Sequence, residues 1–132
     1  MQNELRELPD ISNDFPGWTE LKQRPYLNAV IYEALRIGCG GGVGRLSRMA
    51  HEPMLYRSVP SRDAEKQYEY VIPPGYPIGI DTYTIHYNSQ IYAEPEKFKP
   101  ERWLEEHGER NHRLDDYLMS FSKGSRQCLG MK

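Results

Sequence analysis

The sequence predicts a mainly α-helical chain with small β hairpins. Apolar residues recur at helical spacing in the segment 25–37, and they alternate with polar residues before a Pro-Pro-Gly turn in the segment 68–83. A length of 132 residues fits one compact domain by the usual size of domains. On length alone, the chain is therefore expected to form a single unit, 1–132.

The clearest helix is expected over residues 25–37. Pro25 is tolerated at a first helical position because its missing N–H would have no partner there. Gly38 stands where a left-handed C-terminal cap would end the helix. The apolar stripe of this helix consists of Leu27, Val30, Ile31, Ala34 and Leu35.

Glycine occupies five of the seven positions in the segment 38–44. Such a cluster invites comparison with phosphate-binding loops, but no G-x-G-x-x-G can be drawn through it and no Gly-Lys-Ser/Thr follows. The segment is therefore predicted to be a flexible turn at which the backbone packs closely.

A β hairpin is expected over residues 68–83. Its first strand would run from Tyr68 to Ile72, because alternate residues there are apolar. Pro74 and Gly75 fit a type II turn, in which the glycine takes a positive φ. The second strand would follow over residues 77–83.

Polar or proline-rich segments flank these elements. The segments 57–67 and 105–113 are rich in charged and polar residues and are expected to be exposed loops. Pro95 and Pro100 prevent a long helix in the region between them.

The composition is lean in strongly apolar residues. Val, Ile, Leu and Phe account for 26 of 132 residues, so ten Tyr and two Trp must supply much of any core. The net charge is only −2, from 17 basic and 19 acidic residues. That balance excludes charge-driven disorder and lacks the basic excess of nucleic-acid binders, so no nucleic-acid partner is expected.

No stretch approaches the ~18–20 apolar residues of a membrane span, and the polar start is unlike a signal peptide. No membrane segment is therefore expected in this chain. Cys39 and Cys128 lie 89 positions apart, which excludes a Cys-x-x-Cys zinc or redox motif.

The strongest motif lies at the end of the chain. Residues 121–130 fit the pattern F-x-x-G-x-R-x-C-x-G at all five fixed positions. At average residue usage such a match arises by chance with odds of roughly 10⁻⁵ to 10⁻⁴. On this motif the sequence resembles the haem-thiolate monooxygenases, the cytochromes P450.

The resemblance implies a role for each fixed residue. Cys128, as a thiolate, would be the axial ligand of haem iron. Gly124 and Gly130 would let the backbone approach the porphyrin and aim amide N–H groups at the sulfur. Arg126 would bind a haem propionate, and Phe121 would shield the thiolate from water. Taken alone, Cys128 would be read as an ordinary free or disulfide-paired cysteine.

Two upstream motifs occur in the order that the family requires. Glu33 and Arg36 form E-x-x-R on the predicted helix, where they share a face. Arg102 lies in the Pro-Glu-Arg-Trp segment 100–103, which resembles the family's P-E-R-F/W. The resemblance implies a buried structural network of these three side chains, since two guanidiniums can satisfy one carboxylate. Outside the family, the pair on the helix would be a solvated surface pair.

Weaker similarities agree with this assignment. Arg48, with Arg45 as a competing choice, stands about where the family often has a basic residue near a haem propionate. The residues 72–77 match the family's hairpin turn, and the segment after it contains His86, which is expected to be structural rather than a haem contact. The amino-acid sequences of the hairpin and of the C-terminal motif most resemble those of filamentous-fungal members of the family.

The resemblance runs from about Trp18 to the end of the chain, and it corresponds to a C-terminal portion of the family's fold. The central helix that helps deliver protons to dioxygen, the substrate-contacting half and the helix after the cysteine have no counterpart here. The chain is therefore expected to be a partial cytochrome P450 domain, incomplete by itself. We expect its haem-ligand loop to be present and its catalysis to be absent.

The resemblance also implies the properties of a full-length parent protein. Such a parent inserts one oxygen atom from dioxygen into a small organic substrate, with electrons from an NADPH-dependent reductase. Its relatives are typically anchored to the endoplasmic reticulum membrane by an N-terminal helix, which this chain lacks. The substrate cannot be read from these residues.

Two alternatives remain open from the sequence. The chain could be a non-catalytic haem-binding or interaction module that has kept the motifs; that hypothesis predicts a cooperative fold in isolation. It could also be a small redox protein in which Cys39 and Cys128 form a disulfide, which needs their Cα atoms within about 7 Å.

Overall fold

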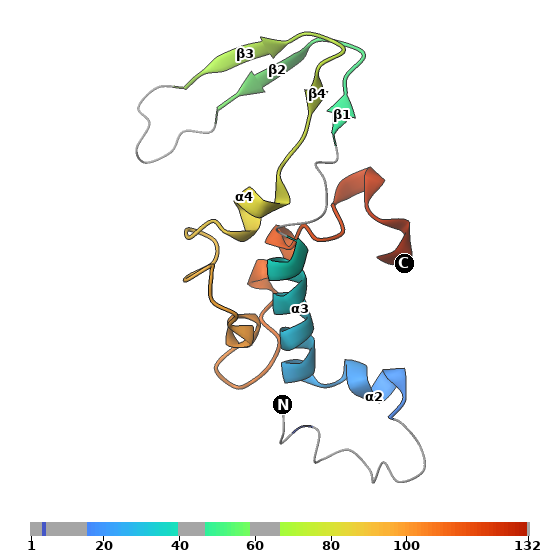
Figure 1. The fold of residues 1–132 in the computed structure, drawn as a ribbon, viewed down its shortest axis with the longest axis vertical. Helices are drawn as coiled ribbons and strands as arrows, with labels where there is room; N and C mark the ends of the chain where they lie inside the picture. The colour runs from blue at the N-terminus through green and yellow to red at the C-terminus, as the bar shows by residue number, and fades with distance from the viewer. Residues whose placement is uncertain (1–3, 5–15, 40–46, 59–66, 132) are drawn as a thin grey trace. The chain divides into compact units, whose positions relative to one another are not determined.

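A computed structural model of the chain describes Glu4 and residues 16–39, 47–58 and 67–131 (Figure 1). The chain divides into two compact units, one formed by residues 1–43 and 82–132 and the other by residues 44–81. Most of the glycine cluster, Arg45 and much of the predicted loop 57–67 lie outside the described residues.

The first unit is organised around one long helix, α3, which spans Pro25–Cys39. It begins at the proline that the sequence marked as a first helical position. The carboxylate of Glu4 accepts hydrogen bonds from the backbone N–H groups of Tyr26 (2.9 Å) and Leu27 (3.2 Å). These amides have no partner within the helix, so a negative charge placed there both caps the helix and complements its dipole.

The end of α3 differs from the prediction, because Gly38 lies inside the helix and not at a left-handed cap. The described glycines with positive φ are Gly75, Gly108 and Gly124. Donors from distant segments reach the last turn of α3 instead. The Ser120 hydroxyl donates to the carbonyl of Leu35 at 3.1 Å, and Nδ1 of His86 lies 2.9 Å from the carbonyl oxygen of Arg36. These tertiary contacts complete the last described turn of the helix, which extends to Cys39.

The fully buried face of α3 is not its apolar stripe. Ala29, Glu33 and Arg36 are each at most 1% exposed, and they lie on one face at a spacing of four and three residues. Within the predicted stripe, by contrast, Ile31 is 44% exposed and Ala34 is also exposed. The helix therefore turns a partly charged face toward the rest of its unit.

The core of this unit is small and rich in aromatic residues. Among the described hydrophobic residues, Ala29, Tyr92 and Trp103 are fully buried. The rings of Tyr92 and Trp103 lie 6.3 Å apart, in tilted contact. Partly buried residues that surround this core are Tyr32, Ile91, Leu104, Leu114 and Leu118.

The chain outside α3 folds into short helices and turns. The α-helices α2 and α4 span Trp18–Lys22 and Thr82–His86. Residues 105–109 form an exposed turn closed by a bridge between Leu104 and Arg110, in keeping with the predicted loop. The 3₁₀ helices are η1 (Pro100–Trp103), η2 (His112–Tyr117), η3 (Gly124–Arg126) and η4 (Leu129–Met131).

The expectation of a mainly α-helical chain is therefore met only in part, since helices occur together with small antiparallel sheets and many turns. Among the described residues, no helix has the length and apolar character needed to cross a membrane.

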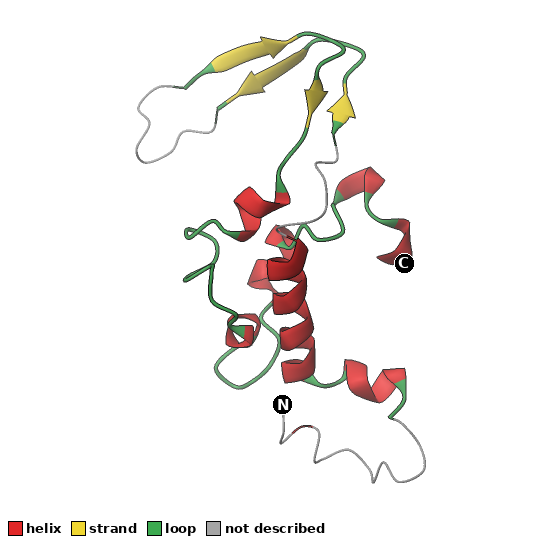
Figure 2. Cartoon of the chain, in the orientation of Figure 1, coloured by secondary structure: helices red, strands yellow, loops and turns green. Residues whose placement is uncertain are grey.

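In the described residues of the second unit, four strands form two antiparallel pairs (Figure 2). Strand β1 (Arg48–Met49) pairs with β4 (Pro77–Ile78). Strand β2 (Met54–Arg57) pairs with β3 (Glu69–Ile72), with Met54 opposite Ile72 and Arg57 opposite Glu69.

The predicted hairpin over 68–83 is therefore wrong in its pairing. The first strand forms, but its partner is β2, and Thr82 and Tyr83 belong to the helix α4. Pro77, the first residue of the predicted return strand, has no backbone donor for a strand ladder, whereas β2 contains no proline. The turn itself has the predicted positive φ, +87°, at Gly75, whose N–H donates to the carbonyl of Ala50 at 3.1 Å.

Candidate functional site

A buried carboxylate, that of Glu33, lies at the centre of the first unit. Arg36, one helical turn later, grips both of its oxygens: Nη2 lies 2.7 Å from Oε1, and Nε lies 3.0 Å from Oε2. Both side chains are 0% exposed. The E-x-x-R pair is thus a bidentate ion pair inside the protein and not a solvated surface pair.

Arg102 completes the predicted trio from the 3₁₀ helix η1. Its Nε donates to Oε1 of Glu33 at 3.1 Å, and its side chain is only 7% exposed. Its other nitrogens donate to the backbone carbonyls of Ala93 (2.6 Å) and Glu94 (3.2 Å). Arg102 therefore ties the meandering segment before η1 to the carboxylate on α3.

Two further donors to Glu33 were not anticipated from the sequence. The backbone N–H of Lys99 donates to Oε1 at 3.1 Å, and the indole N–H of Trp103 donates to Oε2 at 2.9 Å. Trp103 is fully buried, so this hydrogen bond lies in the core. An indole N–H usually finds a partner when it is buried, and the tryptophan in the Pro-Glu-Arg-Trp segment was the available signal.

These partners determine the charge state of Glu33. Burial by itself would raise the pKa of Glu33, but the hydrogen bonds from Arg36, Lys99 and Trp103 and the charge of Arg36 outweigh it. The pKa is held below its usual value. The carboxylate therefore stays ionised at neutral pH, as a bridge between two guanidiniums requires.

His86 is the second buried group that sequence reasoning did not place in this network. Its Nε2 accepts a hydrogen bond from the backbone N–H of Met119 at 2.9 Å, and its own carbonyl accepts one from Nη1 of Arg36 at 2.8 Å. Burial is the main cause that lowers the pKa of His86, and the charge of Arg36 adds to it. No spacing rule predicts such contacts, because the partners lie 50 and 33 residues away.

The C-terminal motif forms a closed loop. The backbone N–H of Cys128 donates to the carbonyl of Phe121 at 3.0 Å, and that of Gln127 donates to the carbonyl of Gly124 at 3.1 Å. Gly124 has a φ of +79°. This backbone conformation is strained for any residue that carries a side chain. The motif's first glycine is therefore needed for the turn of the loop.

The cysteine of this loop carries a free thiol and is exposed. This finding contradicts the hypothesis of a disulfide between Cys128 and Cys39. A side chain on Gly130 would begin 3.8 Å from the sulfur of Cys128, so the glycine leaves that flank of the thiol open. The next residue, Leu129, is 84% exposed and presents an apolar surface beside the thiol.

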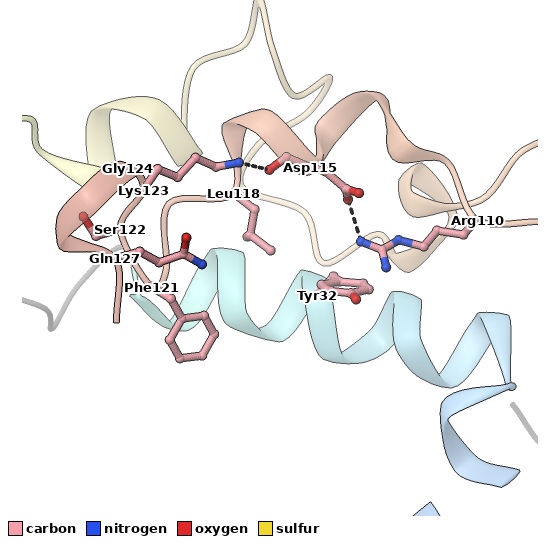
Figure 3. A pocket seen from close by; sticks show the side chains of 9 residues that line it. All are labelled: Tyr32, Arg110, Asp115, Leu118, Phe121, Ser122, Lys123, Gly124 and Gln127. Atoms are coloured by element: carbon pink, nitrogen blue, oxygen red, sulfur yellow. Dashed lines mark hydrogen bonds and ion pairs between the residues drawn. The ribbon is translucent and has the colours of Figure 1, made fainter. Parts of the chain in front are cut away.

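Phe121 lines a pocket on the flank of α3 (Figure 3). The pocket has a volume of about 340 Å³, and Tyr32 contributes to it from the helix. Ion pairing organises its rim, because Asp115 accepts a hydrogen bond from Arg110 at 2.7 Å. The other lining residues are Leu118, Ser122, Lys123, Gly124 and Gln127.

The roles predicted for Arg48 and Arg126 stay predictions. Arg48 lies in β1 of the second unit, is exposed, and donates to the carbonyl of Ser47 at 3.5 Å. Arg126 lies in η3, and its side chain, like all of Arg45, falls outside the described part. In the described segments, no three His, Cys, Asp or Glu side chains form a metal-binding group.

Comparison with known proteins decides the family. The family model described as "Cytochrome P450" matches residues 1–132. The chain belongs to the cytochrome P450 family.

Its curated relatives are fungal cytochrome P450 monooxygenases. The protein tndB of Aspergillus flavipes is 39% identical over 134 residues, which cover 100% of this chain and 24% of that protein. The protein ppzE of Metarhizium rileyi is 38% identical over 141 residues, covering 99% of this chain and 35% of that protein. The protein claJ of Penicillium crustosum is 41% identical over 133 residues, which cover 99% of this chain and 27% of that protein. The chain thus spans between about a quarter and a third of the length of these relatives.

Proposed function

We propose that this chain supplies the thiolate-bearing side of the haem site of a cytochrome P450 monooxygenase. The observation that carries the proposal is the free, exposed thiol of Cys128 at the end of a closed, glycine-turned loop in a chain of this family. A thiolate is the nucleophilic and metal-ligating form of cysteine. Its exposure leaves the sulfur open to a planar cofactor.

The loop residues divide the work of holding a haem. Cys128 would hold the iron through its sulfur, and Arg126 would pair with a propionate. Gly124 makes the turn that brings the Cys128 amide to the Phe121 carbonyl, and Gly130 leaves the sulfur uncrowded. A haem held by this thiolate would supply the activation of dioxygen.

The buried network of Glu33, Arg36 and Arg102 would position the loop and would not contact the reacting atoms. Glu33 joins α3 to η1 through Arg102 and Trp103, and the Ser120 hydroxyl joins the end of α3 to the residue that precedes Phe121. Glu33, Arg36 and Arg102 are therefore positioning residues for the loop, held by charge-assisted hydrogen bonds.

We propose further that the full-length parent inserts one oxygen atom into a small organic substrate with electrons from an NADPH-dependent reductase. The names of the fungal relatives support the monooxygenase activity. The 132-residue chain alone is proposed to be catalytically silent. Cys128, Leu129 and Gly130 are exposed in it, so water would reach a haem bound there and the thiolate would protonate or oxidise.

A titration of the 132-residue chain with ferric haem tests the ligand assignment. Wild type and Cys39→Ala are expected to give the same absorption change, and Cys128→Ala is expected to lose it. An identical spectrum in Cys128→Ala would overturn the assignment. Reduction of the haem-loaded chain under carbon monoxide tests whether the chain is catalytically silent. We expect no lasting red-shifted Soret band of thiolate ligation. Substrate turnover with an added reductase would contradict the proposal that the chain is catalytically silent. It would not contradict the assignment of Cys128 as the ligand.

A thermal melt separates this proposal from a non-catalytic interaction module. A self-sufficient module should unfold cooperatively, with a sharp transition. The fully buried hydrophobic residues in the described chain are only Ala29, Tyr92 and Trp103, so we expect a transition with a low midpoint temperature. A sharp transition without Cys128-dependent haem binding would favour the module.

A further inference from the structure

His86 has two ring contacts whose chemistry determines its protonation. Nε2 lies 2.9 Å from the backbone nitrogen of Met119, and Nδ1 lies 2.9 Å from the carbonyl oxygen of Arg36. A backbone N–H can only donate, so Nε2 must accept. A carbonyl oxygen can only accept, so Nδ1 must carry the hydrogen. The ring is therefore the neutral Nδ1–H tautomer, and a doubly protonated ring could not keep the Met119 contact.

Two reciprocal hydrogen bonds join His86 to Arg36 on the helix. The His86 ring donates to the Arg36 backbone, and Nη1 of the Arg36 side chain donates to the His86 backbone at 2.8 Å. Both side chains are 0% exposed. The ring of Tyr92 meets the imidazole edge-on, with centroids 6.4 Å apart. This packing leaves the imidazole little freedom to turn away from Met119.

The Met119 contact lies at the start of the C-terminal loop. The carbonyl of Met119 accepts the N–H of Ser122 at 3.0 Å, and the carbonyl of Phe121 accepts the N–H of Cys128 at 3.0 Å. A continuous path of hydrogen bonds and backbone thus runs from the α3 carbonyl of Arg36 through the imidazole to the residue that closes on the cysteine.

We propose that His86, as its neutral Nδ1–H tautomer, is a positioning residue that holds the cysteine loop to the C-terminal end of α3. Its relevance to haem ligation rests on the function proposed above, but the positioning itself is a property of the chain without haem. Hydrogen bonds at Met119 and Ser120 hold residues 119–121 to the helix. The position of the Cys128 sulfur would therefore be fixed relative to α3.

Two substitutions separate the two ring contacts. His86→Gln keeps an acceptor near the place of Nε2 and loses the donor to Arg36, whereas His86→Asn keeps a donor near Nδ1 and loses the acceptor. In amide hydrogen exchange on the haem-free 132-residue chain, we expect Met119 and Ser122 to exchange on the order of tenfold faster in His86→Asn. His86→Gln should retain most of the protection. Ser120→Ala, which removes the neighbouring tie to Leu35, is the matched control and should leave Met119 protected.

Equal protection of Met119 in wild type and His86→Asn would overturn the proposal. If both variants fail to fold, the ring ¹⁵N shifts of wild type still decide: a protonated Nδ1 with a bare Nε2 supports it, and the Nε2–H tautomer refutes it. Because none of these measurements uses haem, their failure is distinguishable from a failure of Cys128-dependent haem binding.

Discussion

The indole N–H of Trp103 donates to Oε2 of Glu33 at 2.9 Å in the centre of the core. This contact makes tryptophan a polar member of a network that the sequence suggests is made of Glu33, Arg36 and Arg102 alone. With the backbone N–H of Lys99, the two carboxylate oxygens accept from four different residues. So complete a set of donors explains how a charge can stay buried here.

Trp103→Phe is predicted to destabilise the chain by about 2 kcal/mol, because it removes this donor and leaves a small cavity. It should also raise the pKa of Glu33, since one of the hydrogen bonds that lower it is lost. Urea denaturation followed by circular dichroism measures the first effect, and the carboxyl ¹³C shift of Glu33 measures the second. Trp18→Phe, at a site 75% exposed, is the matched control, and equal behaviour of the two variants would refute the prediction.

Glu33→Gln should be far more harmful than the same change at an exposed glutamate. It leaves the guanidiniums of Arg36 and Arg102 buried without their counter-charge and points an amide donor at them, at a cost of about 3 kcal/mol. Glu94→Gln, whose ion pair with Lys97 lies in solvent, should change stability little. The comparison is made by urea denaturation in low and high salt, and similar losses in both variants would show that burial of the network has no energetic weight.

Stability should fall as the pH falls below about 6.5, the unperturbed pKa of histidine. The pKa of His86 is lowered in the folded chain, so between its folded and unfolded values the unfolded state binds the extra proton. Stability from His86 is therefore complete above pH 6.5 and is lost as the pH falls toward the folded pKa, by at most about 1.4 kcal/mol per pH unit. The groups nearest the ring are the guanidinium of Arg36 and the phenol of Tyr92, and burial raises the pKa of Tyr92 to about 12.

Denaturation of wild type and His86→Gln between pH 7.5 and 5 isolates this effect. Protonation of the other three histidines contributes to both proteins, so only the difference between the two curves reports on His86. Parallel curves would show that His86 does not titrate differently in the folded chain.

Local features were predictable from the sequence, whereas long-range ones were not. The start of α3 at Pro25 follows from a proline and a periodic stripe within one segment. Its end does not, because the donors that complete the last turn come from His86 and Ser120, dozens of residues later. The positive φ of Gly75 likewise follows from the local Pro-Pro-Gly turn, but the partner of β3 is the earlier strand β2, which no local signal identifies.

The candidate site shows the same division. Periodicity favoured Ile31 and Ala34 as buried and a solvated pair at Glu33 and Arg36, yet the structure buries the pair and exposes the other two. Charge pattern alone cannot show that a third side chain, Arg102, satisfies the carboxylate from 69 residues away. Only the resemblance to the family implied that trio, and it gave no indication of Trp103 or His86.

Tyr92→Phe is predicted to leave stability unchanged or to raise it by up to about 1 kcal/mol. The hydroxyl of Tyr92 is buried, and it has no hydrogen-bond partner among the described residues. Burial accordingly raises the pKa of Tyr92 to about 12. Thermal denaturation checks the prediction, with Tyr26→Phe as a control that loses a real bond to Glu101. A clear loss of stability in Tyr92→Phe would reveal a partner, such as a bound water, for this hydroxyl.

Gly124→Ala should loosen the cysteine loop without a steric clash. The φ of Gly124 is +79°, and a Cβ there would meet nothing within 4 Å, so the cost is backbone strain alone, about 1–2 kcal/mol. The amides of Gln127 and Cys128, whose hydrogen bonds close the loop, should exchange roughly tenfold faster or more. Gly130→Ala is the matched control, because its Cβ would make only an ordinary contact of 3.8 Å with the Cys128 sulfur and its φ is not positive. Gly124→Asn should be milder than Gly124→Ala, since asparagine tolerates the left-handed region. If Gly130→Ala opened the loop as much as Gly124→Ala, crowding at the sulfur and not the turn at Gly124 would control its closure.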